Sequence, residues 1–328
     1  MKQLIKIIKK SKRVAVFGHQ SPDGDCLGCI SALSFLFKKY NIQYDNFIDD
    51  DIPERLRFLQ LKDVNSIEFD INNYDLLISV DVASARLLGK YKETFVNFKN
   101  TIVIDHHLKR DLNGKVCYVD SKKASCCEVI YELLKKAKVH FTAEVATYLY
   151  LGVVDDTGCF LHDNTTAYTH KVAYHLINDG ANLKLINYNI AKYQSLKTFY
   201  INKLLDNMIV FDDNVYYLCI SHKFMKDNNF SKSEIGDYVN KLVNLENCKI
   251  SFVISEKQKN LFSVSLRCLQ GYDVSKVANK FGGGGHIQAS GCEITGDFND
   301  ILKKVIQECK TAISEAENVW KEWFDNFK

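Results

Sequence analysis

The chain has 328 residues, of which 46% are hydrophobic and 25% are charged, and its formal net charge is +3. This is an ordinary globular composition for about two domains, and it excludes a collagen-like or largely disordered chain. So small a net charge does not indicate a duplex-DNA binder, although it leaves room for a short single-stranded ligand in a local basic groove.

The sequence also gives no sign of a membrane or secreted protein. No run of about eighteen apolar residues occurs, so no membrane-spanning helix is expected. Lysines interrupt the apolar positions of residues 1–19 and no small-residue cleavage site follows, which indicates an amphipathic helix and a strand rather than a signal peptide. The eleven cysteines are odd in number and scattered, so we expect reduced thiols and a cytoplasmic location.

Apolar runs of strand length alternate with helical patterns through the first half of the chain. In chain order the predicted elements are a strand over 13–19, a helix over 26–40, strands over 74–81 and 100–107, and helices over 128–139 and 142–158. This alternation predicts an α/β fold with a mostly parallel sheet and flanking helices. Ligands of such sheets bind beyond the carboxyl ends of the strands, and all three predicted strands end in acids or histidines.

The pattern changes in the second half of the chain. A helical connector is predicted over 181–207, and hairpins over 208–221 and 249–268 follow it. The only glycine cluster is FGGGGH at 281–286. The predicted organisation is therefore an α/β domain over 1–190, a helical linker over 191–207 and a smaller α+β domain over 208–328.

Cys26 and Cys29 form a C-x-x-C pair at the start of the first long predicted helix. A zinc site would need two more ligands, and no second C-x-x-C supplies them. Two small buried thiols are the simpler interpretation, and a structural or redox role is the alternative.

The loop after the first predicted strand holds one imidazole and two carboxylates within seven residues, namely His19, Asp23 and Asp25. Pro22 and Gly24 shape the turn, so these side chains can point to one place. Carboxylates suit Mg²⁺ and Mn²⁺, and Mn²⁺ also accepts imidazole. The alternative for this loop alone is a polar turn whose acids cap the next helix.

Other predicted elements end in the same kinds of residue. They supply Asp81, the triplet Asp105-His106-His107, and the pair Asp155-Asp156 followed by Thr157 and Gly158. Two adjacent histidines at the end of a strand cannot both point into the core. Any one segment could be a solvated loop or a helix cap, but together they contain enough ligands for two cations about 3.5–4 Å apart.

In sequence order these segments resemble the four motifs of the DHH phosphoesterase superfamily. The matching residues are H-x-x-P-D-G-D-x-x-G at 19–28, the isolated Asp81, D-H-H at 105–107 and D-T-G at 156–158. The glycine-rich FGGGGHIQASG at 281–291 and SLR at 265–267 resemble the DHH-associated C-terminal domain. The order and spacing of these motifs match the superfamily over nearly the whole chain. The chain is most similar to its short, two-domain nano-RNase (NrnA-type) group.

This resemblance implies a hydrolase of phosphate esters that uses two Mn²⁺ ions, with Mg²⁺ as a substitute. It implies release of 5′-mononucleotides from very short single-stranded RNA, and removal of the 3′-phosphate from 3′-phosphoadenosine 5′-phosphate. Linear or cyclic di-AMP is the alternative substrate class, because some relatives cleave such molecules. Dimers are common in similar proteins, so a homodimer is expected, and no membrane partner is implied.

Position by position, the resemblance implies six metal ligands: His19, Asp23, Asp25, Asp81, His106 and Asp156. Asp81 would bridge the two ions, and Asp156 would join His19 and Asp23 on the first. His107 would contact the phosphate or protonate the leaving oxygen, and Asp105 would orient a neighbouring histidine. Asp155 is expected to be a bystander. Cys29, where the family often has Ser, and Ala-Ser-Gly at 289–291, where Ala-Ala-Gly is common, leave the expected ligands intact.

Substrate contacts are expected from two further places. Arg86 stands where family members often carry Arg, and a surface helix charge is its alternative. In the C-terminal domain, the far phosphate or the base is expected to contact Arg267, Gly283, Gly284 and His286. Arginine grips phosphate with two hydrogen bonds, and glycines can offer backbone N–H groups to an anion. The alternative for the glycine cluster is a flexible loop with a solvent-facing histidine. If the two domains instead bind both ends of a substrate, short substrates would be favoured.

Two other functions compete with this interpretation. Manganese inorganic pyrophosphatases share the D-H-H core, but their second domain carries a different basic signature. A nucleotide- or RNA-binding protein with an inactive core should have lost some ligands, and none of the expected set is missing here.

Overall fold

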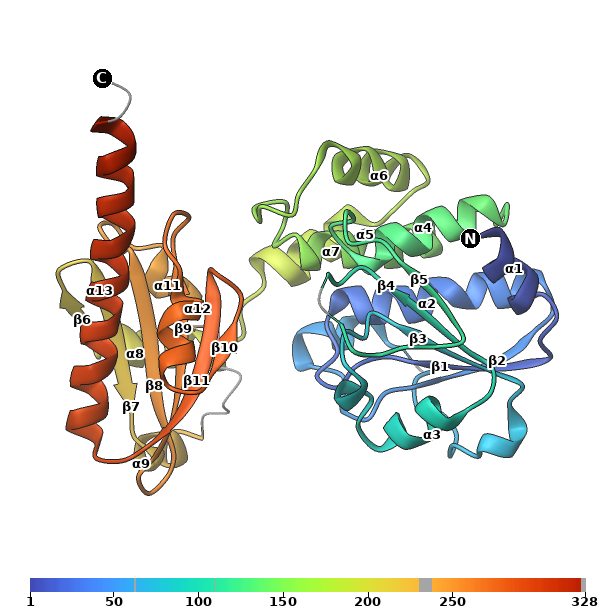
Figure 1. Cartoon of the computed structure of the whole chain (residues 1–328). Helices are drawn as coiled ribbons and strands as arrows, with labels where there is room; N and C mark the ends of the chain where they lie inside the picture. Colours follow the sequence, from blue (N-terminus) through green and yellow to red (C-terminus); the bar gives the residue numbers. More distant parts are fainter. Residues whose placement is uncertain (62, 109, 230–237, 326–328) are drawn as a thin grey trace. The chain divides into compact units, whose positions relative to one another are not determined.

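The computed structural model describes residues 1–61, 63–108, 110–229 and 238–325, with side chains described to residue 319. The chain forms two compact units, Met1–Tyr193 and Gln194–Lys328 (Figure 1). Each unit has its own sheet and its own hydrophobic core. Within the described residues, no helix combines the length and the apolar character that crossing a membrane requires.

The first unit is built on a five-stranded sheet in the order β2-β1-β3-β4-β5, and every neighbouring pair is parallel. Its strands are β1 (Arg13–Phe17), β2 (Gln43–Phe47), β3 (Leu76–Val80), β4 (Thr101–Asp105) and β5 (Val116–Val119). The strands β3 and β4 are buried along their whole length, as is typical of parallel strands covered on both faces. The predicted α/β fold class is therefore confirmed.

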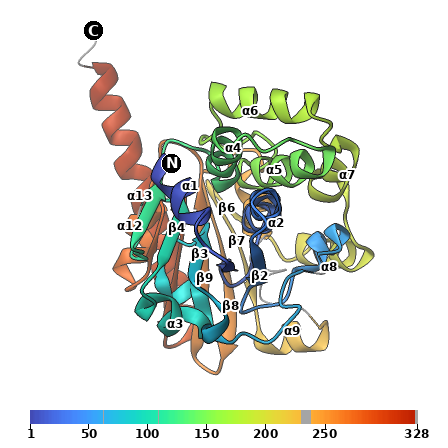
Figure 2. The same ribbon diagram turned by 90° about the vertical axis from the view of Figure 1, so that its right-hand side faces the viewer.

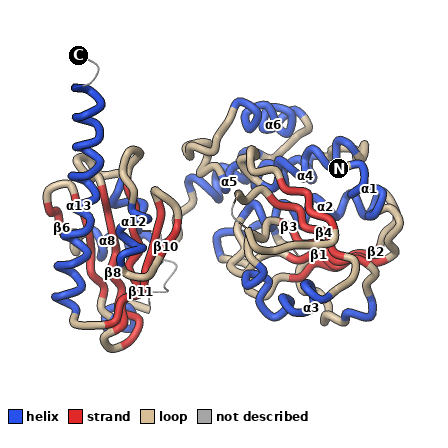
Figure 3. Tube along the Cα trace, in the orientation of Figure 1, coloured by secondary structure: helices blue, strands red, loops and turns tan. Residues whose placement is uncertain are grey.

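Helices cover both faces of this sheet (Figures 2 and 3). They are α1 (Lys2–Ile8), α2 (Gly24–Lys39), α3 (Lys92–Asn97), α4 (Cys126–Lys136), α5 (Ala143–Asp156), α6 (Ala167–Asn178) and α7 (Leu183–Asn187). Shorter helical segments are η1 (Glu54–Leu59), η2 (Ile71–Asn73), η3 (Ala85–Tyr91) and the π-helical η4 (Tyr188–Lys192). Helices α1, α2, α4 and α5 share one core with the sheet, and an aromatic cluster around Phe17, Phe47 and Phe95 covers the other face.

Two glycines allow α2 and α5 to approach each other closely. A Cβ on Gly28 would lie 2.5 Å from the backbone oxygen of Tyr148, and one on Gly152 would lie 2.3 Å from Cys127 Sγ. Neither position has room for a side chain. The close contact packs the first turn of α2, which carries Asp25, against α5 and the start of α4.

The second unit is a six-stranded mixed sheet in the order β10-β11-β9-β8-β7-β6. Its strands are β6 (Val210–Asp212), β7 (Val215–Ile220), β8 (Ile250–Gln258), β9 (Leu261–Cys268), β10 (Gly284–Gly285) and β11 (Ala289–Thr295). All neighbouring pairs are antiparallel except β7 and β8. Both predicted hairpins are present, as β6–β7 and β8–β9.

Helices also pack on both faces of the second sheet. They are α8 (Leu196–Asp206), α9 (His222–Asp227), α11 (Tyr238–Val243), α12 (Val274–Lys280) and α13 (Phe298–Asp325). Helices α12 and α13 share a core with Phe252 and Leu266. Helices α8 and α11 pack against Leu218 and Val253, so α8, which the sequence pattern placed in the linker, contributes to a core of the second unit.

Candidate metal centre

Acids and histidines meet at the carboxyl edge of the first sheet. The converging residues are His19 after β1, Asp23 and Asp25 at the start of α2, Asp81 after β3, Asp105, His106 and His107 at the end of β4, and Asp156 at the end of α5. Parallel strands all end at the same edge, which is why residues far apart in the sequence come together here. The convergence on which the sequence-based hypothesis depends is therefore present.

His19, Asp23 and Asp81 form the first group of potential ligands. His19 Nε2 lies 3.7 Å from Asp23 Oδ1 and 3.5 Å from Asp81 Oδ2. The other ring nitrogen, Nδ1, lies 2.8 Å from the Gln20 carbonyl oxygen. If Nδ1–H donates to this carbonyl, Nε2 is left to bind a metal. Asp23 also caps the first turn of α2, so capping and ligation are compatible at this residue.

His106, Asp25 and Asp156 form the second group. His106 Nε2 lies 3.5 Å from Asp156 Oδ2 and 4.0 Å from Asp25 Oδ2. It also lies 3.5 Å from Asp81 Oδ1, so Asp81 presents one oxygen to each group. His106 Nδ1 lies 3.3 Å from the Lys123 carbonyl oxygen, which again leaves Nε2 for a ligand. Asp156 thus lies with His106 and Asp25, whereas the resemblance implies a place for it with His19, and Asp81 lies beside both groups.

Several of these acids are buried or crowded by other carboxylates. Asp25 and Asp81 are 1% and 3% exposed. Asp81 Oδ1 and Asp156 Oδ2 are buried without a hydrogen-bond partner. Burial and the neighbouring carboxylates raise the pKa of Asp25, and they raise the pKa of Asp156 to about 7. Divalent cations would supply the missing positive charge, so this donor set fits a metal centre.

The two histidines respond to the same crowding of acids. Burial disfavours their charged forms, but the carboxylates beside them prevail and raise the pKa of His19 to about 11 and that of His106 to about 10. Positive charge is therefore strongly favoured at both imidazoles, and a bound cation would take the place of their protons.

Asp81 has a left-handed backbone conformation, with a φ of 58°. For a residue with a side chain this conformation costs about 1–2 kcal/mol. Its N–H donates to the Ile104 carbonyl oxygen at 3.0 Å, which ties the turn after β3 to the neighbouring strand β4. A strained residue held in this way at the centre of two ligand groups is typical of a functional position.

Asp25 is held by the start of α4. Its carboxylate oxygens accept the backbone N–H groups of Cys126 and Cys127 at 2.5 and 2.8 Å. Ser125 caps that helix by accepting the N–H of Glu128. The sequence pattern gave this segment no role, although Ser-x-x-Glu is the signature of a helix start. Its role is to fix a predicted ligand through the N-terminus of α4.

Asp105 orients His107, as the resemblance implies. Asp105 is fully buried, and its Oδ1 lies 2.7 Å from His107 Nδ1. The same oxygen accepts the backbone N–H groups of His106 and His107. These contacts fix the His107 ring and leave its Nε2 for other partners.

Asp155 is not in either ligand group, but it is more than a bystander. Its Oδ2 accepts the Gly24 N–H at 2.5 Å, and both of its oxygens pair with Arg55. A Cβ on Gly24 would lie 2.7 Å from the Asp155 carboxylate, so the contact requires glycine. Asp155 thereby joins the loop of the first motif to the end of α5. Sequence reasoning missed this link because the partners lie 131 positions apart.

Comparison with known proteins agrees with the geometry. The model of the DHH family, N-terminal domain, matches residues 13–153, and that of the DHHA1 domain matches residues 212–311. The chain belongs to the DHH family. The resemblance that the motifs carry is thereby confirmed, and the two units are referred to below as the DHH and DHHA1 domains.

Relatives of known function cover nearly the whole chain. It is 29% identical over 318 residues to the bifunctional oligoribonuclease and PAP phosphatase NrnA of Mycoplasma genitalium, covering 93% of this chain and 97% of the relative. It is 25% identical over 329 residues to the Bacillus subtilis protein of the same name, covering 96% and 99%. The crystal structure of an exopolyphosphatase-related protein from Bacteroides fragilis shares the fold, with a TM-score of 0.86 at 20% identity over 96% of this chain and 97% of the other.

In the DHHA1 domain, strand register places Arg267 and His286 in one row of the sheet. Arg267 on β9 pairs with Ala289 on β11, and Ala289 exchanges backbone hydrogen bonds with His286 at 2.8 and 3.2 Å. Residues paired in this way point to the same face of a sheet. The Arg267 Nε donates to Asn240 Oδ1 at 2.7 Å, and His286 is exposed. Two predicted substrate residues therefore share one face.

The glycine cluster forms a short strand and not an open loop. Gly284 pairs with Gly291 of β11, and a Cβ on Gly283 would lie 2.2 Å from the Gly291 oxygen. The Gly283 N–H already donates to the Ala278 carbonyl at 2.9 Å. The expectation that Gly283 offers its N–H to an anion does not fit this geometry. Its lack of a side chain instead allows β10 to pack closely on β11.

Arg86 is exposed near the start of η3, and the structure does not bring it into either ligand group. The start of η3 is held by Asp111, which accepts the Ala85 N–H at 2.7 Å and the Ser84 hydroxyl at 3.0 Å. The substrate contact predicted for Arg86 stays a prediction.

Proposed function

We propose that this protein is a two-metal phosphoesterase that hydrolyses very short RNA to 5′-mononucleotides and removes the 3′-phosphate from 3′-phosphoadenosine 5′-phosphate. One observation supports it above all: the two oxygens of Asp81 lie 3.5 Å from the Nε2 atoms of His19 and His106, a placement suited to bridging two cations. The names of the relatives, oligoribonuclease and PAP phosphatase, support the substrate class.

Two Mn²⁺ ions fit this ligand set, with Mg²⁺ as a substitute. Carboxylates suit both cations, and imidazole suits Mn²⁺ better. His19, Asp23 and Asp81 would hold one ion, and the other would be held by Asp81, His106, Asp25 and Asp156. The chemistry that such a pair of ions supplies is activation of a water molecule and stabilisation of charge on the phosphate.

His107 is the residue that meets the substrate in this proposal. Its side chain is 40% exposed, whereas the Asp105 that holds its Nδ1 is fully buried. The hydrogen bond to Asp105 raises the pKa of His107, so its ring can carry a proton. From Nε2 it can bind a phosphate oxygen or give that proton to the leaving oxygen.

The DHHA1 domain would bind the other end of the substrate. Arg267 suits a phosphate because a guanidinium can donate two parallel hydrogen bonds to it, and His286 lies in the same row. Gly284 leaves the surface of β10 free of a side chain, and Arg86 of the DHH domain is a further proposed phosphate contact. Binding of both ends would favour short substrates, so we expect a cutoff in substrate length.

The test is a Mn²⁺-dependent activity panel. RNA from two to about twenty nucleotides, 3′-phosphoadenosine 5′-phosphate, linear diadenylate and pyrophosphate would be compared at equal concentration. The proposal expects hydrolysis of the shortest RNA and of the 3′-phosphate, with activity falling steeply as the strand lengthens. Cleavage of pyrophosphate alone, or binding of dinucleotide without cleavage, would contradict it. We also expect a cytoplasmic homodimer, and light scattering of the purified protein tests the assembly.

A further inference from the structure

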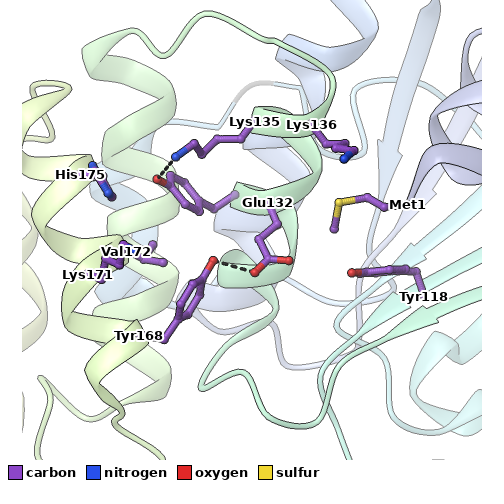
Figure 4. A pocket seen from close by; sticks show the side chains of 10 residues that line it. Met1, Tyr118, Glu132, Lys135, Lys136, Tyr168, Lys171, Val172 and His175 are labelled. Atoms are coloured by element: carbon purple, nitrogen blue, oxygen red, sulfur yellow. Dashed lines mark hydrogen bonds between the residues drawn. The ribbon is translucent and has the colours of Figure 1, made fainter.

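A cleft outside the metal centre lies in the DHH domain between α4, α6 and the edge strand β5 (Figure 4). Its volume is about 520 Å³, which is in the range of sites that hold small molecules. Tyr118 comes from β5, Lys135 and Lys136 from α4, and Tyr168 and Lys171 from α6. None of these residues belongs to the proposed metal ligands or substrate contacts.

The cleft carries an excess of positive charge. Among the described residues, the ammonium groups of Lys135, Lys136 and Lys171 have no carboxylate partner. Lys135 Nζ donates to the Tyr131 hydroxyl at 3.1 Å and lies 5.1 Å from the centre of the Tyr131 ring. The one acid in the wall, Glu132, is already paired with Lys123. Its charge therefore does not cancel that of the three lysines, and an anion in the cleft would be favoured.

The Tyr168 ring of the cleft is held in place by two contacts. The Tyr168 hydroxyl donates to Glu132 Oε1 at 2.7 Å, and the Lys123 ammonium lies 3.4 Å from the centre of the Tyr168 ring. Figure 4 shows Glu132 between Tyr168 on one side and Tyr118 on the other. Tyr118 is half-buried on the edge strand. Fixed aromatic surfaces beside cations are the combination that binds a nucleobase and its phosphate together.

We propose that this cleft is a second nucleotide site, which binds a nucleoside phosphate with its phosphate on Lys135, Lys136 and Lys171 and its base on the tyrosine rings. The ligand is a free mononucleotide or the terminal nucleotide of an RNA strand, which share this chemistry. The inference does not depend on the proposed hydrolysis. One residue connects the two sites, because Lys123 pairs with Glu132 through its side chain and faces His106 Nδ1 through its carbonyl oxygen.

The experiment compares three forms of the full-length protein in the presence of Mn²⁺. They are the wild type, the double variant Lys135→Ala/Lys171→Ala, and a control, Lys184→Ala/Lys203→Ala, which removes the same charge from exposed positions on α7 and α8. Hydrogen–deuterium exchange of α4 and α6 is followed during titration with AMP, with inorganic phosphate, and with an RNA of about ten nucleotides whose phosphorothioate linkages slow cleavage. Hydrolysis of a short RNA is measured in parallel.

Protection of α4 and α6 by AMP identifies a site for free nucleotides, and protection by the RNA alone identifies a site for a strand end. In either case the cleft variant should need about tenfold more ligand for half-maximal protection than the wild type and the control. Its hydrolysis of short RNA should stay within about twofold of the wild-type rate. A Tyr118→Leu variant should lose affinity for AMP but keep its affinity for phosphate. Equal protection in the cleft variant, no protection by any ligand, or equal affinity for phosphate and AMP would overturn the proposal. Loss of hydrolysis in the wild type would instead count against the proposed function.

Discussion

Asp155 connects two ligand-bearing segments, so replacing it should weaken metal binding without removing a ligand. Its Oδ2 accepts the Gly24 N–H at 2.5 Å, and its two oxygens accept from Arg55 at 2.7 and 2.9 Å. Gly24 lies between two proposed ligands, and Asp155 directly precedes a third. This carboxylate therefore links the start of α2, next to the loop after β1, to the end of α5.

The exposure of the partners sets the size of the effect. The Asp155 side chain is 11% exposed and that of Arg55 is 47% exposed. A hydrogen bond to a charged acceptor contributes about 1.5–3 kcal/mol, whereas a half-exposed ion pair contributes about 0–1 kcal/mol. Asp155→Ala should therefore lower the free energy of unfolding by about 1.5–4 kcal/mol, and Arg55→Ala by about 0–1 kcal/mol. Loss of a contact that orients a ligand typically costs metal affinity about 10- to 100-fold.

The assay is a Mn²⁺ titration of hydrolysis for the wild type and both variants, with urea unfolding to measure stability. Asp155→Ala should need about 10- to 100-fold more Mn²⁺ for half-maximal activity. Arg55→Ala should shift the midpoint by less than about threefold, because the Gly24 contact remains. A wild-type titration curve for Asp155→Ala would refute the reasoning. Equal shifts in the two variants would show that the Gly24 contact is not what positions the ligands.

Three further outcomes are expected. Gly283→Ala should destabilise the DHHA1 domain by about 1–3 kcal/mol in urea unfolding, whereas Gly284→Ala, whose Cβ has no neighbour nearer than 3.6 Å, should fold normally. Asp81→Asn should lower kcat by about a thousandfold or more with an unchanged circular dichroism spectrum, and near-normal turnover would contradict the bridging role. Finally, Mn²⁺ must displace protons from His19 and His106, whose pKa values are raised to about 11 and about 10. The apparent Mn²⁺ affinity in calorimetric titrations should therefore rise from pH 6 to pH 8. A flat profile would count against these ligands.

The strands that carry the ligands were predictable because each is a buried apolar run that stops at a polar residue. The edge strands β2 and β5 lack that signal. In β2, Gln43 is exposed and Tyr44 and Asp45 are half-buried, so the segment contains no apolar run. β5 has four residues, none of them fully buried. A strand with one neighbour and a partly solvated surface leaves a weak pattern in the sequence.

The convergence of the proposed ligands was also predictable, because the chemistry that suggests it resides in their side chains. What holds them was not. Asp25 is bound by the backbone N–H groups of residues 126 and 127, and His106 faces the backbone carbonyl of Lys123. Backbone donors and acceptors are present at nearly every position, so no residue type reveals them. The prediction for the glycine cluster was wrong in part because one composition suits two structures. Four glycines are typical of an anion-binding loop, but they also permit the close packing of β10 on β11.

This dependence on the backbone determines where the site can tolerate sequence change. The Asp25 carboxylate accepts the backbone N–H groups of residues 126 and 127, and any residue except proline can supply such a group. Gly24 and Gly152 are not free in this sense, because a Cβ at either position would lie 2.7 Å or less from a carboxylate oxygen of Asp155 or Asp25. The constraint therefore falls on the acids, the histidines and the glycines that admit them.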